Sequence, residues 1–488
     1  MKAGLRASYF LGMVIVMAAW AVSARADGIQ FEEVSGAAGI GYVGPSWGSA
    51  WGNYNGDLYP DLWLVDHWNR PGLYVNQGNG CFVDVVFQII PAEFYGNDTH
   101  GATWVDYDND GDQDLYHLAD FDPESYLPLR DFFFINNEGQ MDESADSLGL
   151  KYPLGRGRMP LWVDYDRDGL LDAFRPTSQR PGSADGPTVL FRHGPYGFTD
   201  VSEQVGLEQS EDGNEFALLA DLSGDGRLEL ITHVTGPFPE KVYEMTDVPF
   251  EDIREDLGIP TNSWVNDAVA GDFDGDLDND LFMIRGEKEE GFLQVDGNTV
   301  EVAFLAAHPV EMGVGFETAG EVTIDLYPKW KYGLDKIFIG AGGCHPEDFC
   351  FTLSPADTNV CGVCEHEPGA ELAVYVGYDS CSQCWQILHS QMAINLVVTS
   401  TESIFALSAI GWDPEAPPLS DHYLVNLGDG FEDRTVSAGF LEPSSGRGVL
   451  SGDFDNDMDL DLYIVSTGPV ENAPNILYRN DGGGSFHK

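Results

Sequence analysis

Basic residues are few in this sequence. Its 24 lysines and arginines stand against 81 aspartates and glutamates, so the formal net charge is −57 at pH 7. A field of that sign repels nucleic acid and anionic lipid, and it therefore disfavours both as partners. Aromatic residues make up 12% of the chain, however, which is too many for a disordered acidic tail. The composition predicts a folded acidic protein of 488 residues, long enough for more than one domain.

Long apolar runs are also scarce. The run over residues 9–22 is short for a membrane span, and no second span follows it. Lys2 and Arg6 precede this run, and the small residues 24–26 after it look like a cleavage site, so residues 1–26 are predicted to be a signal peptide. No cysteine comes just after the run, so a lipid anchor is not expected. We expect an exported protein without a membrane span after signal removal, either secreted or retained in a periplasm or at the cell surface.

Cysteine is sparse, with seven residues, and six of them lie within residues 344–384. The last four are spaced as C-x2-C, sixteen residues, C-x2-C, which is the spacing of a four-thiolate zinc site. Export to an oxidising compartment favours disulfides instead, and six cysteines can pair completely. We therefore predict disulfides, with Zn²⁺ at the last four as the less favoured alternative, and a buried core position for Cys81. The six residues are Cys344, Cys350, Cys361, Cys364, Cys381 and Cys384.

Aspartate, by contrast, is concentrated in one repeated loop. Its clearest copy begins at Asp106 and places carboxylates at positions 1, 3, 5 and 9, with Gly111 at position 6. Alternate side chains then point inward and the glycine permits a sharp bend, so the loop can supply the roughly six to eight oxygens that Ca²⁺ prefers, including the carbonyl of position 7. Six segments align on these positions. The candidate ligands are Asn53, Asn55, Asp57, Tyr59 and Asp61 in loop one; Asp106, Asp108, Asp110, Asp112 and Asp114 in loop two; Asp164, Asp166, Asp168, Leu170 and Asp172 in loop three; Asp221, Ser223, Asp225, Arg227 and Glu229 in loop four; Asp272, Asp274, Asp276, Asp278 and Asp280 in loop five; and Asp453, Asp455, Asp457, Asp459 and Asp461 in loop six.

The six loops are not equivalent. Loops two, three, five and six carry four carboxylates at the side-chain positions, loop four carries three, and loop one carries two. Because affinity for Ca²⁺ follows the number of charged ligands, loop one is predicted to be the weakest or empty. Position 6 is Leu58, Leu277 and Met458 in loops one, five and six, so their geometry is expected to depart from that of a glycine turn.

The loops recur at a fixed period. The first five start 53, 58, 57 and 51 residues apart, which marks a repeat architecture. Short β-type runs flank each loop, and position 12 is not the glutamate that an EF-hand needs. Each unit ends in a strand, an Asn/Gly turn and a returning strand, such as residues 73–82. Four strands per unit predict the blade of a β-propeller, with six blades counted and a degenerate seventh as the alternative. Residues 31–39 resemble a blade-ending strand and are predicted to complete the last blade.

The sequence resembles the FG-GAP/VCBS repeats of the integrin α-subunit N-terminal propeller and its exported bacterial relatives. The resemblance rests on the aspartate-rich loops followed by hairpins of the Leu-Tyr-x-Asn-x-Gly-x-Gly-x-Phe type, over residues 31–290 and 418–488. It implies one Ca²⁺ per intact loop, bound on one rim of the propeller. It does not imply one activity, because such propellers serve mostly in adhesion and binding.

A long interruption separates loops five and six, which start 181 residues apart. The excess falls inside the fifth unit and predicts an inserted domain at residues 291–417, between propeller parts 27–290 and 418–488. Its runs alternate in the manner of β-strands, and about six to eight of them predict a jelly-roll-like β-sandwich. A carbohydrate-binding module would look like this, as would many other sandwiches.

No catalytic residue or organic cofactor is predicted. The G-x-S-x-G match at residues 44–48 lacks the strand-to-helix turn that a nucleophile elbow requires. His67, His100 and His193 have no sequence partner at catalytic or metal-binding spacing. Tryptophans 51, 104 and 162 each precede the first ligand of a loop by two residues, and this regular placement predicts packing between blades.

Two functions are consistent with these features. The first is a monomeric exported protein that binds an extracellular glycan or protein ligand, in adhesion for example, with calcium in a structural role. The alternative is an extracellular enzyme that acts on a polysaccharide as a lyase or hydrolase. Such an enzyme would need a carboxylate pair or a Lys/Arg/His set outside the loops, and the sequence does not reveal one.

Overall fold

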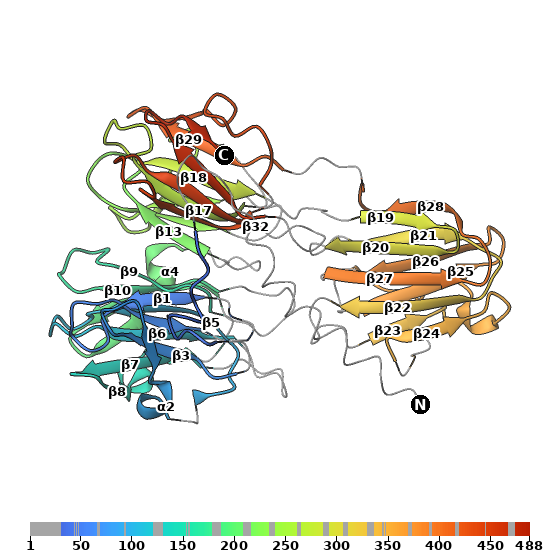
Figure 1. The fold of residues 1–488 in the computed structure, drawn as a ribbon, viewed down its shortest axis with the longest axis horizontal. Helices are drawn as coiled ribbons and strands as arrows, with labels where there is room; N and C mark the ends of the chain where they lie inside the picture. The colour runs from blue at the N-terminus through green and yellow to red at the C-terminus, as the bar shows by residue number, and fades with distance from the viewer. Residues whose placement is uncertain are drawn as a thin grey trace.

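The computed structural model shows an all-β chain, whose described residues form six four-stranded antiparallel sheets and two five-stranded sheets (Figure 1). The predicted signal peptide, residues 1–26, lies outside the described residues. The structure describes residues 31–488 apart from 43, 45, 47, 66–68, 92–93, 121–129, 153, 155–156, 178–186, 208–215, 234–239, 261–264, 286–291, 306–310, 329–335, 344–345, 347, 369–372, 390–392, 415–418, 445 and 467–473.

The six four-stranded sheets, here called repeat sheets 1 to 6, follow one another along the chain. Sheet 1 contains β1 (Ser49–Gly52), β2 (Asp61–Leu64), β3 (Gly72–Asn76) and β4 (Phe82–Asp84); sheet 2 contains β5 (Thr99–Val105), β6 (Asp114–Ala119), β7 (Phe132–Asn137) and β8 (Gln140–Glu143); and sheet 3 contains β9 (Leu161–Val163), β10 (Asp172–Arg175), β11 (Val189–Gly194) and β12 (Gly197–Asp200). Sheet 4 contains β13 (Phe216–Ala220), β14 (Glu229–His233), β15 (Lys241–Glu244) and β16 (Glu251–Asp252); sheet 5 contains β17 (Val265–Gly271), β18 (Asp280–Arg285), β29 (His422–Asn426) and β30 (Phe431–Asp433); and sheet 6 contains β31 (Gly446–Gly452), β32 (Asp461–Ser466), β33 (Ile476–Asn480) and β34 (Phe486–His487).

Consecutive repeat sheets pack face to face. One cluster of buried apolar side chains joins each successive pair, from sheets 1 and 2 to sheets 5 and 6. Trp104 shows how the sequence achieves this packing: a Cβ at Gly52 of sheet 1 would lie 2.2 Å from its ring, so only glycine leaves room for it. Trp162 likewise packs against Phe133 of sheet 2. The predicted packing role therefore holds for these two tryptophans, whereas Trp51 is 57% exposed.

The N-terminal segment does not supply a strand to the last sheet, so this prediction was wrong. Sheet 6 obtains its fourth strand, β34, from the C-terminal end of the chain, where Phe486 pairs with Asn480. A short hairpin closes at a lower entropic cost than a pairing between the two ends of the chain. Phe31 instead packs edge-on against Phe454 of sheet 6, with 6.2 Å between ring centroids. The carbonyl of Ala38 accepts a hydrogen bond from Phe82 N of sheet 1 at 2.7 Å. The segment thus contacts both end sheets, which share no apolar cluster among the described residues.

Among the described residues, helices are few and short. Three single-turn helices follow the outer strands of sheets 1, 2 and 3, and two of them end at glycines with left-handed backbone, Gly149 and Gly206. They are α2 (Val86–Ile89), α3 (Ala145–Leu148) and α4 (Ser202–Val205), and a 3₁₀ turn, η2 (Thr358–Val360), lies in the insert. In the described part of the chain, no helix is long and apolar enough to cross a membrane.

The insert is a sandwich of two five-stranded sheets that stands beside the repeat sheets in Figure 1. One buried cluster fills the space between its sheets and includes Phe316 and Trp385, both fully buried. The expectation of six to eight strands was too low, because short strands such as β24 carry no clear alternation. The first sheet contains β19 (Phe292–Asp296), β20 (Thr299–Leu305), β22 (Val322–Pro328), β24 (Cys350–Leu353) and β27 (Ala393–Ser400), and the second contains β21 (Met312–Glu317), β23 (Lys336–Ile339), β25 (Ala373–Asp379), β26 (Cys384–His389) and β28 (Phe405–Ile410).

The insert interrupts sheet 5 between β18 and β29, which pair directly, with Phe282 opposite Tyr423. Asp421 joins the two chain segments at this junction. Its Oδ1 accepts hydrogen bonds from Arg285 N and from Ser444 Oγ, each at 3.0 Å. The carboxyl is 2% exposed, and burial raises its pKa to about 6 although these hydrogen bonds oppose the shift.

Replacing Asp421 by asparagine is expected to change how stability depends on pH. The pKa of this carboxyl is raised in the folded state, so its contribution is fully present below the unfolded pKa and is lost as pH rises through about 6. The amide oxygen of the introduced asparagine can keep both hydrogen bonds without ionising. The stability of Asp421→Asn relative to wild type should therefore increase by about 2–3 kcal/mol between pH 4 and pH 7.5. Denaturant unfolding at the two pH values measures this, and a constant difference would contradict it.

Candidate functional site

Each aspartate-rich loop joins the first two strands of one repeat sheet. In loops two, three, five and six, three carboxylates place one oxygen each within 4.8 Å of the others. An ion bound among such oxygens could replace their mutual repulsion by attraction. The structure gathers Asp106, Asp108 and Asp110; Asp164, Asp166 and Asp172; Asp272, Asp274 and Asp276; and Asp453, Asp455 and Asp461.

The carboxylate at position 9 begins the second strand and fixes the loop to the sheet. In loop two, Asp114 Oδ1 accepts the N–H of Asn136 at 2.8 Å and its Oδ2 accepts the N–H of Tyr107 at 3.3 Å. Loops one, three, four, five and six repeat the bond to the loop backbone, through Asp61, Asp172, Glu229, Asp280 and Asp461. All six side chains belong to residues that are at most 1% exposed. In sheet 2 the loop and the hairpin therefore share one buried acid, and Asp61, Asp172, Asp280 and Asp461 do the same in sheets 1, 3, 5 and 6.

Burial disfavours the ionised form of these acids. It raises the pKa of Asp114 and of Asp172 to about 7 and that of Asp280 to about 6, while backbone hydrogen bonds oppose the shift. The nearby acids of each loop raise the pKa further. A bound cation would reverse this balance by stabilising the carboxylate form, so the residues present fit a hard divalent ion such as Ca²⁺.

Backbone geometry at position 6 differs from the expectation for the loops that lack glycine. Gly111 has φ 98°, and Leu277 and Met458 adopt the same left-handed region with φ 80°. A side chain there usually costs about 1–2 kcal/mol, yet both side chains are about nine-tenths exposed and make no compensating core contact. Loops five and six therefore keep the turn despite their residue type. Leu58 of loop one is not among the described residues with positive φ.

Position 7 plays one role in all six loops. Its backbone N–H donates to the carboxylate at position 5, for example Asp112 N to Asp110 Oδ1 at 2.9 Å. This turn leaves the carbonyl of position 7 available as a ligand. The same bond is made by Tyr59 to Asp57, Leu170 to Asp168, Arg227 to Asp225, Asp278 to Asp276 and Asp459 to Asp457.

Loops one and four do not gather three carboxylates. In loop four, Ser223 Oγ donates to Glu229 Oε1 at 3.1 Å, so the neutral ligand is engaged by the acid at position 9. In loop one, the side-chain amide of Asn53 donates to the carbonyl of Asp57, and that of Asn55 donates to Asp57 Oδ2 at 2.9 Å. The two amide groups of loop one are thus engaged within the loop itself.

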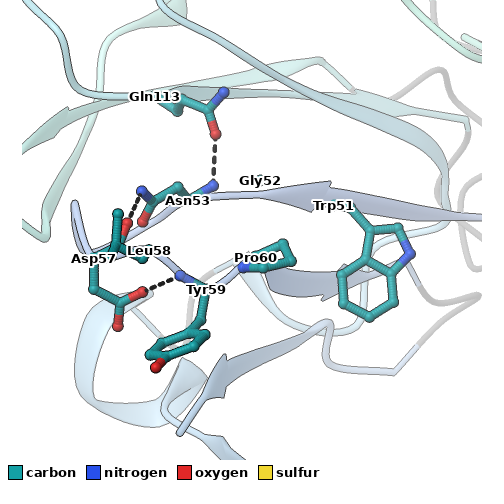
Figure 2. Close-up of a pocket in the computed structure, with 8 residues that line it drawn as sticks. All are labelled: Trp51, Gly52, Asn53, Asp57, Leu58, Tyr59, Pro60 and Gln113. Atoms are coloured by element: carbon teal, nitrogen blue, oxygen red, sulfur yellow. Dashed lines mark hydrogen bonds between the residues drawn. The ribbon is translucent and has the colours of Figure 1, made fainter. Parts of the chain in front are cut away.

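Loop one borders a shallow depression of about 440 Å³ (Figure 2). The figure shows Trp51 and Tyr59 on either side of Pro60, with polar side chains above them. Trp51 is 57% exposed and Tyr59 46% exposed. Gln113 of sheet 2 reaches into the same place, where its Oε1 accepts the N–H of Asn53 at 2.5 Å. The depression therefore combines exposed aromatic rings with hydrogen-bonding groups from two sheets.

An arginine side chain contacts two candidate ligands of loop three. Arg192 Nε lies 2.5 Å from Asp166 Oδ2, and its Nη2 lies 2.7 Å from Asp168 Oδ2, so two candidate ligands share one guanidinium. Arg479 approaches Asp455 of loop six less closely, at 3.8 Å. Arg192 must withdraw before both carboxylates can bind a cation.

Replacing Arg192 by alanine is expected to raise the calcium affinity of loop three. The change removes a positive charge that competes directly with the ion, and at this partly exposed site we expect an increase of about 3- to 10-fold. Calorimetric titration of chelator-treated protein resolves the change, with Arg70→Ala as the control because Arg70 pairs with Asp84 outside the loops. An unchanged or lower affinity in Arg192→Ala would contradict the competition.

Five of the six cysteines of the insert lie among the described residues. Cys350, Cys361, Cys364, Cys381 and Cys384 make no disulfide, and among the described residues no group of three metal-binding side chains contains a cysteine. Cys344 lies outside the described residues. The disulfides and the zinc alternative both stay predictions. Cys81 is exposed, so the prediction of a core position was wrong: it lies in the hairpin turn between β3 and β4.

Two features of the structure were not found from the sequence. The first is a set of buried polar side chains at the end of sheet 2: His100 Nε2 lies 2.8 Å from Asp120 Oδ2, and Arg158 Nη1 lies 3.1 Å from the same oxygen. His100 therefore has partners that are distant in sequence. His193 instead stacks on Phe198, with 4.4 Å between ring centroids, and His67 lies outside the described residues.

The second feature is a clamp made by the asparagine of the hairpin motif. Asn136 Nδ2 donates to the carbonyl of Tyr54 in loop one at 2.8 Å, and Asn480 Nδ2 donates to that of Phe273 in loop five at 2.7 Å. Asn426 makes the same bond to Leu222 in loop four at 3.0 Å. These buried amides tie the hairpins of sheets 2, 5 and 6 to the loops of the preceding sheets, so in these three pairs the neighbouring loops lie close together.

Comparisons with known proteins identify the repeat. A family model of the FG-GAP-like repeat matches residues 53–117, which contain loops one and two. No curated protein sequence matches the chain. The chain is therefore an all-β protein with an FG-GAP-like repeat, and its described sheets carry the same four-stranded unit six times.

Solved structures resemble the chain only remotely. The V. cholerae biofilm matrix protein Bap1 is 11% identical with a TM-score of 0.33, over 89% of this chain and 78% of its own. An exo-β-1,3-galactanase from Phanerochaete chrysosporium, bound to β-1,3-galactotriose, is 10% identical with a TM-score of 0.30, over 75% and 97%. The Dos1 propeller is 9% identical with a TM-score of 0.29, over 72% and 67%. Similarities at this level assign no activity.

Proposed function

We propose that this chain is an exported, calcium-stabilised β-propeller that binds an extracellular glycan. The six repeat sheets serve as its blades, and the insert is carried on the fifth. Ca²⁺ binds at loops two, three, five and six in a structural role, more weakly at loop four and not at loop one. The first 26 residues direct export, and the mature protein acts as a monomer outside the cytoplasm, either released or held at the cell surface.

The proposal of a glycan ligand rests on the depression beside loop one. The flat face of a sugar ring packs well on an exposed indole or phenol ring, and its hydroxyl groups need directed polar partners. Trp51 and Tyr59 offer the rings, and Asn53, Asp57 and Gln113 offer the polar groups. A larger hollow of about 590 Å³ lies between loops three and four, but its Trp162 is half-buried against sheet 2. Exposed aromatic rings favour the site at loop one.

Binding to a glycan microarray in millimolar Ca²⁺ tests this function. We expect retention on at least one polysaccharide class, and loss of most of it in Trp51→Ala. Leu58→Ala is the matched control, because Leu58 lines the same depression and is 95% exposed but offers no ring. Binding that is unchanged in Trp51→Ala would place the ligand-binding site elsewhere. If the chain binds a protein and no glycan, the proposal of a glycan ligand is wrong.

The alternative is a polysaccharide lyase or hydrolase, and the same glycans test it by turnover. The set around His100 has the residue types that such an enzyme needs outside the loops. Its side chains are 12% exposed at most, however, so a polymer cannot reach them in this conformation. Burial of this set favours binding over catalysis.

A further inference from the structure

The buried set at the end of sheet 2 is independent of the calcium loops. Asp98 immediately precedes β5, His100 is the second residue of that strand, and Asp120 immediately follows β6. Loop two joins the other ends of the same two strands. Because β5 has seven residues, about 20 Å separate the set from the loop.

The three side chains present their donor atoms to a common point. His100 Nε2 lies 2.8 Å from Asp120 Oδ2 and 3.6 Å from Asp98 Oδ1, and one ligand atom from each residue lies within 4.8 Å of the other two. Donor atoms about 2.0–2.1 Å from a single metal ion are about 3–3.5 Å apart in tetrahedral or octahedral coordination. The observed spacing therefore needs only a small adjustment to surround one ion.

Backbone contacts hold this arrangement in place. The pairing of β5 with β6 shifts register between Thr99 and Ala102, and such a bulge redirects a side chain. Gly101 lies in the bulge, where a Cβ would meet the carbonyl oxygen of Arg158 at 2.1 Å, so the segment that leads into sheet 3 approaches closely. Asp120 N donates to the carbonyl of Asp98 at 2.8 Å. The site is thus built from both strands and the neighbouring sheet.

A bound cation would stabilise the buried charge of the set. The side chains of Asp98 and Asp120 are 0% and 2% exposed, and two carboxylates at this depth are unfavourable without positive charge nearby. Arg158 supplies one charge through its contact with Asp120 at 3.1 Å. A metal ion bound among the three donor atoms would add positive charge and stabilise both carboxylates further.

Polar atoms beside the set favour an ion with its water. His117 faces Ala102 across the strand pair, two residues from His100, and is 3% exposed. Among the described residues, its Nε2 has no hydrogen-bond partner, and neither has the indole N–H of Trp63, whose ring lies 5.4 Å from the imidazole. Buried polar atoms without a protein partner commonly mark an ordered water or ion.

We propose that Asp98, His100 and Asp120 bind one divalent transition-metal ion, of the zinc or manganese class, with water completing its coordination. One imidazole and two carboxylates make a mixed nitrogen and oxygen set, which suits these ions, whereas Ca²⁺ prefers oxygen alone. The ion ties β5 to β6 at the end that lacks a calcium loop, and Arg158 positions Asp120 from the next sheet.

Cobalt titration tests the site. The full chain is used with its thiols alkylated, in millimolar Ca²⁺ so that the loops are filled, and Co²⁺ is followed by its visible absorption. We expect one Co²⁺ per chain with nitrogen and oxygen coordination, and an affinity at least about 10-fold lower in His100→Asn. His422→Asn is the control, because His422 also pairs with an aspartate, Asp433 at 2.8 Å, but near the surface. No saturable site, or equal affinity in His100→Asn, overturns the proposal.

A measurement on the unmodified chain covers the case in which His100→Asn does not fold. Mn²⁺ is loaded in the presence of millimolar Ca²⁺, and pulsed electron paramagnetic resonance detects nitrogen coupled to the metal. Since the calcium loops offer oxygen ligands only, one coupled imidazole nitrogen supports the site. Absence of any coupled nitrogen would mean that His100 does not bind the metal, and the proposal would be wrong.

Discussion

Replacing Arg175 by alanine is expected to destabilise the repeat sheets by about 3–5 kcal/mol, the largest effect we anticipate from a single side chain. Arg175 ends β10 and Asp131 precedes β7, so their ion pair joins sheets 2 and 3. Both side chains are 0% exposed, and the guanidinium bonds to the carboxylate through Nε at 2.5 Å and Nη2 at 3.1 Å. Its Nη1 donates to Thr177 Oγ1 at 2.6 Å, and its Cζ lies 4.5 Å from the ring centroid of Tyr152. Alanine would leave a carboxylate buried without its counter-charge.

A double variant separates the ion pair from the packing around it. In Arg175→Met with Asp131→Leu, both charges are replaced by apolar groups of similar size, and we expect most of the lost stability to return. Urea unfolding of the single and double variants measures this. Arg434→Ala serves as the surface control, because its pair with Glu432 is 38% and 55% exposed and should contribute under about 1 kcal/mol. Equal losses in the single and double variants would show that shape, rather than charge, matters at this position.

Removal of calcium is expected to have the other large effect. An ion present at 100 times its dissociation constant stabilises the folded state by about 2.7 kcal/mol per site, and four occupied loops would together contribute on the order of 10 kcal/mol. Without the ion, each loop returns to clustered carboxylates whose ionised form burial disfavours. We expect chelation to lower the unfolding temperature of the repeat sheets by on the order of 10 °C.

Differential scanning calorimetry measures this change in unfolding temperature and shows whether it belongs to the repeat sheets or to the insert. The transition of the insert should stay in place, because its core is a separate apolar cluster and its described acids form no candidate cation group. Addition of Ca²⁺ should restore the repeat transition, whereas Mg²⁺ at the same concentration should restore less, because it demands a smaller octahedral site. A repeat transition that does not move after chelation would contradict a structural role for calcium.

The local features of the fold followed from the sequence. The spacing of aspartates indicated the loops, and the β-type runs beside them became the first two strands of each repeat sheet. In the insert, alternating runs became strands such as Lys336–Ile339 and Phe405–Ile410. These features depend only on residues that are close together in the sequence. The alternation or spacing of residues over about ten positions is therefore enough to predict them. Some of the strands beyond the expected number are short or contain glycine, such as β24 and β21, and acquire their structure from their partners.

Tertiary structure decided the contacts between sheets. Trp51 and Trp104 occupy the same position in the repeat. Trp104 of sheet 2 is buried because it packs against sheet 1, whereas Trp51 belongs to the first repeat sheet and is exposed. The cluster of Asp98, His100 and Asp120 forms because a hairpin brings residues about 20 positions apart to one end of a sheet. The sequence by itself therefore determined the repeating unit and its acidic loops. Which side chains became buried partners depended on how the sheets stack, because burial and charge pairing are properties of the assembled chain.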